Sequence, residues 1–226
     1  MLSFRVRCLT PALVLALIGA CRSARSTPES SSTSPAADGS DPYVARARAD
    51  SIRRPYTQAD VYFVSGMIDH HSQAILMAGW SRSHGAGHEV RTLSERIINA
   101  QQDDITLMRR WLRDRRQLVP AGSPRGMQMI VDGVAHPMLM PGMLTDDQLD
   151  QLDRARGEAY DRLFLTFMIQ HHQGAVTMVK ELFSTPGAGQ DETVFKLASD
   201  VNVDQTTEIA RMQKMLSELA LERRAP

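Results

Sequence analysis

Apolar residues recur every three to four positions along most of the chain, and strict alternation of apolar and polar residues is nearly absent. This spacing is typical of amphipathic α-helices. It predicts helices over about residues 58–82, 89–116, 145–154, 158–183 and 191–221. Thr57 suits the N-cap of the first, and Thr145 to Gln148 have the spacing of a capping box. The pattern therefore predicts an all-α protein.

One block of this pattern occurs twice, which indicates an internal duplication. Met67-Ile68-Asp69-His70-His71, with Ala74 and Met77 after it, recurs 101 residues later as Met168-Ile169-Gln170-His171-His172, with Ala175 and Met178. The following helices also correspond, since Gln101, Asp104 and Met108 match Gln205, Glu208 and Met212. A helical hairpin used twice predicts a four-helix bundle made of two antiparallel hairpins.

Within each block, the histidines and methionines share one helix face. At about 100° per residue they fall on a stripe about 120° wide, from which Asp69 and Gln170 point away. Imidazole binds several transition metals, and thioether selects soft ions such as Cu(I). The stripes are candidate copper-binding faces that should meet across the bundle. Core packing is the alternative for each methionine, whereas four buried imidazoles are costly without partners. The candidate ligands are Met67, His70, His71, Met77, Met168, His171, His172 and Met178.

Asp104 and Glu208 occupy equivalent positions in the second helix of each hairpin. They either form surface ion pairs with arginine or accept a hydrogen bond from a ligand imidazole and fix its tautomer. With an ordinary imidazole pKa of about 6.5, Cu(II) binding should weaken between neutral pH and about pH 5, while thioethers keep Cu(I).

Residues 117–144 join the two hairpins without an obvious helix. Met138, Met140 and Met143 give this connection methionine spacings that resemble those of extracytoplasmic copper handlers. Met140 and Met143 are therefore further candidate ligands, and hydrophobic anchoring of the connection is the competing explanation.

The N-terminus has the features of a bacterial lipoprotein signal. Arg5 and Arg7 precede a short apolar stretch that ends in Leu17-Ile18-Gly19-Ala20-Cys21, which fits a lipobox with Cys21 as the acylated residue. A secretory signal cleaved near Ala20 is the alternative. We expect a signal over 1–20, a Ser/Pro-rich flexible tether over 21–42 and the bundle over 43–226.

Processing would remove Cys8 and place lipid on Cys21, the second of only two cysteines. The bundle then has no thiolate, and its soft ligands are methionines. The chain has 26 basic and 26 acidic residues, and this balance gives no support for nucleic-acid binding. We expect a location at the bacterial cell envelope, held at the membrane by lipid and facing the periplasm or the exterior.

The doubled Met-Ile-x-His-His block, Met140-Pro141-Gly142-Met143 and the Gln-x-x-(Asp/Glu)-Ile-x-x-Met helices resemble the CopM-like family, catalogued as domain of unknown function 305. The resemblance covers about residues 55–220. It implies a ferritin-like four-helix bundle and, for some exported members, copper binding and copper tolerance. It marks the same eight stripe residues as ligands, with Met140 and Met143 in addition. The Glu-x-x-His pattern of ferritin di-iron sites is not found on the facing helices, which disfavours iron oxidation.

These features favour a non-enzymatic lipoprotein that binds copper, preferring Cu(I) with Cu(II) possible, and sequesters it or passes it to a delivery partner. A di-metal oxidoreductase with Asp104 and Glu208 as carboxylate ligands is the first alternative. A metal-free interaction scaffold is the second.

Overall fold

The structure is a computed structural model that describes residues 42–53, 55–131 and 134–222. The predicted signal over 1–20 and nearly all of the predicted tether lie outside the described residues. Pro42, the last residue assigned to the tether, instead begins a helix. No described helix is both long and apolar enough to cross a membrane.

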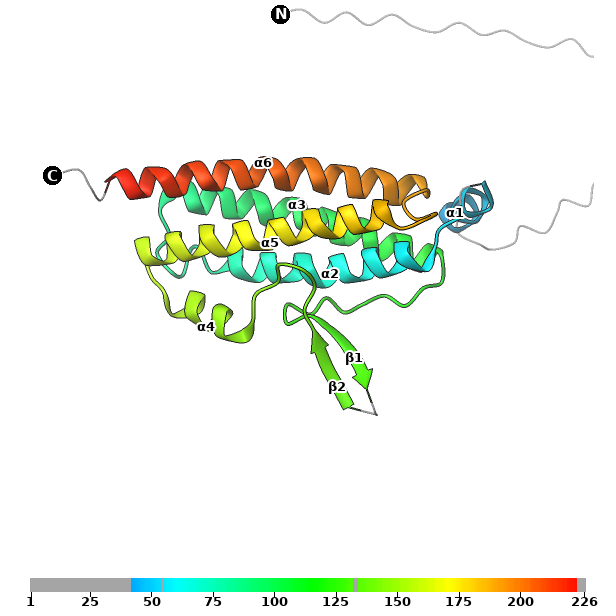
Figure 1. Cartoon of the computed structure of the whole chain (residues 1–226), viewed down its shortest axis with the longest axis horizontal. Coiled ribbons are helices and arrows are strands. Elements are labelled where there is room, and N and C mark those ends of the chain that lie inside the picture. The colour runs from blue at the N-terminus through cyan, green and yellow to red at the C-terminus, as the bar shows by residue number, and fades with distance from the viewer. Residues whose placement is uncertain (1–41, 54, 132–133, 223–226) are drawn as a thin grey trace, which may run out of the picture. The chain divides into compact units, whose positions relative to one another are not determined.

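Four long helices form the bundle, and they begin and end close to the residues that the sequence predicts (Figure 1). They are α2 (Gln58–Gly79), α3 (His88–Asp114), α5 (Glu158–Ser184) and α6 (Glu192–Glu222). Helix α2 packs on α3, α5 packs on α6, and α2 contacts α5 across the bundle. The predicted all-α bundle of two helical hairpins is confirmed.

Local capping explains where α2 and one short helix begin. The Thr57 hydroxyl accepts a hydrogen bond from Asp60 N, and the Asp60 carboxylate accepts one from Thr57 N at 2.6 Å. Thr145 and Gln148 form the predicted capping box of the short helix α4 (Asp146–Arg154). Each pair satisfies backbone N–H groups that a helix start would otherwise leave unpaired.

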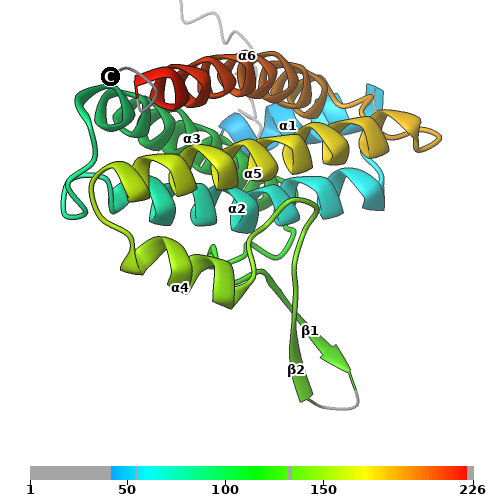
Figure 2. The same ribbon diagram turned by 60° about the vertical axis from the view of Figure 1, so that its left-hand side comes forward.

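Three described elements, one helix and two strands, were not predicted. Helix α1 (Pro42–Arg53) lies beside α3, where the Arg110 guanidinium stacks 3.7 Å from the centre of the Tyr43 ring. Strands β1 (Met127–Val131) and β2 (Val134–Met138) form an antiparallel hairpin within the connection. Figure 2 shows this hairpin projecting from the bundle.

The apolar core is divided into two parts along the bundle. The first core cluster includes Phe63, Met67, Met108, Met178 and Leu197, and the second includes Met77, Ile97, Tyr160, Met168 and Met212. The first half of α2 shares a cluster with the last half of α5, as expected for antiparallel helices. Near the middle of both helices, the two copies of the histidine pair lie between the clusters.

Candidate metal site

The four histidines of the repeated block are completely buried, with no exposed surface on any of them. The ring centres of His70 on α2 and His171 on α5 are 3.8 Å apart, with 39° between the ring planes. His71 and His172 lie on the outer sides of this pair, with ring centres 6.4 Å from His70 and 6.2 Å from His171, respectively. The two stripes face each other as predicted, because an antiparallel pair of identical motifs brings equivalent residues together.

Three of these imidazoles use the same ring nitrogen for a hydrogen bond. His70 Nε2 lies 3.0 Å from the Pro141 carbonyl oxygen, His71 Nε2 lies 3.2 Å from Asp104 Oδ2, and His172 Nε2 lies 2.7 Å from Glu208 Oε2. A carbonyl or carboxylate oxygen only accepts, so each Nε2 donates its proton. A neutral ring of this tautomer carries its lone pair on Nδ1.

Five imidazole nitrogens are left buried without a hydrogen-bond partner among the described residues. They are Nδ1 of His70, His71 and His172, and both nitrogens of His171. Buried polar atoms are normally paired, and an exception calls for a functional explanation such as a bound ion. A layer of lone pairs therefore lies within the bundle where metal ligation would satisfy it.

The geometry decides between the two explanations for Asp104 and Glu208. Neither carboxylate is paired with arginine among the described ion pairs, and each instead holds an imidazole. Their side chains are 32% and 16% exposed, so they connect the buried histidines to the surface between α3 and α6.

Burial keeps the central imidazoles neutral. It lowers the pKa of His70 to about 3, helped by the charge of neighbouring His71. Burial and then His70 lower the pKa of His171 well below 6.5. Burial also lowers the pKa of His172, although the hydrogen bond to Glu208 opposes this shift. Neutral imidazole is the form that binds metal ions.

The structure does not gather the ten candidate ligands into one set. Met67 and Met178 lie in the first core cluster with Met140 and Met143, whereas Met77 and Met168 lie in the second. Ten residues separate Met67 from Met77, a rise of about 15 Å in a helix, so the two cannot bind the same ion. Among the described residues, no three His, Cys, Asp or Glu side chains are placed to hold a metal ion between them. A ligand number above two would need thioethers or a change of side-chain rotamer.

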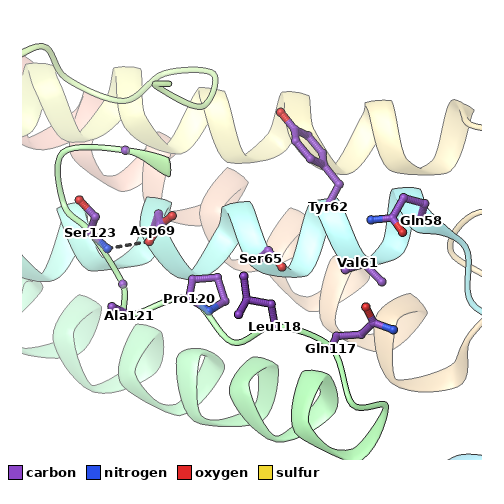
Figure 3. A pocket seen from close by; sticks show the side chains of 12 residues that line it. Gln58, Val61, Tyr62, Ser65, Asp69, Gln117, Leu118, Pro120, Ala121 and Ser123 are labelled. Carbon is purple, nitrogen blue, oxygen red and sulfur yellow. Dashed lines mark hydrogen bonds between the residues drawn. The ribbon is translucent and has the colours of Figure 1, made fainter. Parts of the chain in front are cut away.

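Asp69 points away from the histidines, as expected, but not into solvent. It is 3% exposed and accepts a hydrogen bond from Ser123 N at 2.6 Å (Figure 3). Burial raises the pKa of this carboxyl group. Gln170 lies on the side of α5 that faces the connection, where its amide donates to the Gly142 carbonyl. Both residues anchor the connection to the bundle.

His70, His71, His171 and His172 together form what we call the histidine layer. The connection covers this layer on the side of α2 and α5. The Gln73 side chain bonds both the N–H and the carbonyl of Leu144, at 2.6 and 3.1 Å. A Cβ atom on Gly174 would lie 1.9 Å from the Pro141 oxygen, so only glycine permits this approach. Met140 and Met143 are 3% and 5% exposed within the core, which fits the anchoring role left open above.

The sequence prediction missed the Pro141 carbonyl, Gly174 and Gly66, whose lack of a Cβ leaves room for the Met140 side chain. The carbonyl is invisible to a search by side-chain type, because any residue could supply it. The glycines did leave a signal, because an isolated glycine within a helical pattern indicates close approach of another segment.

The comparisons with known proteins identify the family of this bundle. Residues 60–216 match the family model described as Domain of unknown function (DUF305), and the chain belongs to this family. No match to the chain is found among curated proteins.

Solved structures give similar bundles. A DUF305 protein of Streptomyces coelicolor is 29% identical, with a TM-score of 0.60 over 72% of this chain and 94% of that one. A DUF305 fragment from Deinococcus radiodurans is also 29% identical, with a TM-score of 0.58 over 72% of this chain and 98% of that one. CopM in its Cu(I)-bound form is 27% identical, with a TM-score of 0.53 over 70% of this chain and 96% of that one. CopM is also known in Cu(II)-bound, Ag-bound and apo forms.

Proposed function

We propose that the protein binds copper as its cargo within the bundle and sequesters it or passes it on. The observation that carries this proposal is the layer of five buried imidazole nitrogens without partners at His70, His71, His171 and His172. Leaving such atoms unpaired lowers stability. Each neutral ring has one lone pair, so a metal ion would bond to one nitrogen of a ring and leave one His171 N–H.

The available donors fit copper in both oxidation states. Imidazole suits Cu(II) and Cu(I), and the thioethers of Met67, Met178, Met77 and Met168 on either side favour the soft Cu(I) ion. We infer that Asp104 and Glu208 orient His71 and His172 through their hydrogen bonds. Similarity to CopM, which has been solved with Cu(I), Cu(II) and Ag, supports the same assignment.

We place this activity at the bacterial cell envelope. The lipobox ending at Cys21 supports export and lipid anchoring, and methionine remains a usable soft ligand where thiols oxidise. If the protein passes copper on, a delivery partner would receive the metal ion.

Titration of the purified protein tests the proposal. Isothermal titration with Cu(II), Zn(II) and Fe(II), and chelator competition for Cu(I), should show tight binding of copper. Replacing the four histidines by leucine should abolish Cu(II) binding. A His84→Leu variant is the control, because His84 is 5% exposed but both its ring nitrogens are partnered. Unchanged copper affinity in the fourfold variant would reject the proposal, and preference for Fe(II) would favour the di-metal alternative.

A further inference from the structure

A cavity of about 280 Å³ lies where the connection meets α2 and the last turns of α5. Its lining includes Tyr62, Met140, Pro141, Met178 and Glu181. Tyr62 is 48% exposed and Glu181 is also exposed, so the cavity opens to solvent. Met140 and Met178 are nearly buried, at 3% and 4% exposed, and form its inner wall. Two thioethers from different segments therefore line one solvent-connected space.

The Met140 thioether is held in place by its neighbours. The Tyr62 hydroxyl donates to its sulfur at 3.9 Å. A Cβ atom on Gly66 would lie 2.4 Å from the Met140 methyl carbon and 3.2 Å from its sulfur, so glycine lets this side chain lie against α2. An O–H···S bond is weak, and a soft ion could displace it.

A single residue, Pro141, separates the cavity from the histidine layer. Pro141 forms part of its lining, and the carbonyl oxygen of the same residue accepts the hydrogen bond from His70 Nε2. His171 follows directly, with its ring centre 3.8 Å from that of His70. Two thioethers and one peptide group thus lie between solvent and His70 on this side of the bundle.

We propose that this cavity is the entry site for a soft monovalent cation, Cu(I) or Ag(I). The ion binds first to Met140 and Met178, drawn in by the negative charge of Glu181. It then moves to Nδ1 of His70 and to the lone-pair nitrogen of His171, while His70 Nε2 keeps its proton hydrogen-bonded to the Pro141 carbonyl. The transfer exchanges ligands only, so the oxidation state of the ion does not change. This inference rests on the proposed copper-binding function.

Rapid mixing of the full-length protein with Ag(I), in competition with a metal indicator, tests the entry route. In a Met140→Leu/Met178→Leu variant the association rate should fall at least tenfold. Met212→Leu/Met215→Leu is the matched control, because these two buried methionines lie in the second core cluster, away from the cavity. Equal rates in the two double variants would overturn the proposal. Asp204 lies on α6, close to the charges of Asp104 and Glu208. An association rate lowered by Asp204→Asn instead would indicate entry from that side and would also overturn the proposal.

Two glycine variants test the same route without removing a donor atom. Gly66→Ala should displace Met140 and slow Ag(I) uptake several-fold, whereas Gly79→Ala, with nothing within 4 Å of the added Cβ, should not. Identical uptake by both variants would contradict the role of Met140.

Failure of the entry site is distinguishable from failure of the proposed function. In the fourfold histidine variant, a fast and weak Ag(I) phase at the cavity should remain while tight retention is lost. If the fourfold histidine variant still binds Ag(I) tightly, the histidine layer is not the tight binding site, whatever the methionine variants show.

Discussion

At the scale of single residues, the pairing of ring nitrogens separates a structural histidine from the four central ones. His84 is buried, and both of its nitrogens have partners in Ser83 and Asp153. His171 is buried with neither nitrogen paired. The first arrangement stabilises the fold, and the second lowers stability unless a ligand is bound.

Replacing His171 by leucine should therefore stabilise the metal-free protein. Removing an unpaired buried polar group should raise the free energy of unfolding by about 1–3 kcal/mol, and copper should no longer add its full stabilisation. Urea denaturation with and without metal measures both effects. His84→Leu should do the opposite, lowering stability and leaving copper affinity unchanged. A metal-free protein weakened by His171→Leu would show that the ring is needed for packing.

The lowered pKa values of His70, His171 and His172 also predict how stability depends on pH. Below about pH 6.5, down through the lowered pKa of each ring in the folded protein, the unfolded chain binds protons on these rings and the folded protein binds fewer. The free energy of unfolding should therefore decrease as the pH falls through this range, by up to about 1.4 kcal/mol per pH unit for each ring. Urea denaturation at pH 7.5, 6.0 and 5.0 measures the slope, since most carboxylates titrate lower. A variant with these three histidines replaced by leucine should show a much smaller slope.

The same burial changes the expectation for Cu(II). From an ordinary imidazole pKa, binding should weaken near pH 6, but the pKa of His70 is about 3. Protons then compete poorly for His70, so Cu(II) bound through this ring should be retained below pH 6, which copper titration at pH 7 and pH 5 measures.

At the scale of elements, the connection between the hairpins is the part that breaks the twofold repetition. Gln73 and Gly174 occupy equivalent positions in the two blocks. The Gln73 side chain on α2 hydrogen-bonds to the connection. Gly174 has no Cβ, so the connection can pass close to α5. Because Pro141 is in this crossing, the position of the segment determines whether His70 has its acceptor.

A single methyl group should disturb this crossing. In Gly174→Ala the added Cβ would meet backbone atoms of Pro141 and Gly142, which cannot move aside as a side-chain end could. We expect a loss of about 1–3 kcal/mol of stability, typical of overpacking, with weaker copper binding. Gly79→Ala is the control and should be neutral or stabilising by up to about 1 kcal/mol. Chemical denaturation and copper titration of both variants measure the difference. Equal stability would mean that the connection is not packed on α5 in solution.

At the scale of the whole molecule, the histidine layer divides the core into two apolar halves and makes the metal-free bundle less stable than an apolar core would. Ligand binding to the folded state adds about 2.7 kcal/mol when the free ligand is at 100 times its Kd. For a domain of this size that corresponds to a rise in Tm of roughly 5–10 °C. Thermal denaturation with Ag(I) should show this rise, and the fourfold histidine variant should lack it. A similar rise in both proteins would locate the binding elsewhere.

Membrane attachment also belongs to this scale. Replacing Cys21 by serine should leave the protein without lipid and release it from the membrane fraction, because the predicted acylation site is gone. Palmitate labelling and cell fractionation measure this. A variant that remains labelled and membrane-bound would contradict the lipobox assignment.

The sequence by itself determined the bundle and its symmetry. Helical periodicity, the caps at Thr57 and Thr145, and the repeated blocks are local or periodic signals, so they fixed the helices and the meeting of His70 with His171. Helix α1 escaped prediction because it directly follows a Ser/Pro-rich stretch, and it is placed by lying beside α3.

Only the tertiary structure decided which atoms work together. A helical projection places Met67 and Met77 on one stripe because it discards the rise along the axis, and the folded bundle separates them into two clusters. The pairing of Nε2 with Asp104, Glu208 and the Pro141 carbonyl depends on neighbours far away in the chain. Burial, which lowers the pKa of His70, is likewise a property of the packed molecule, because desolvation depends on every segment that surrounds the ring.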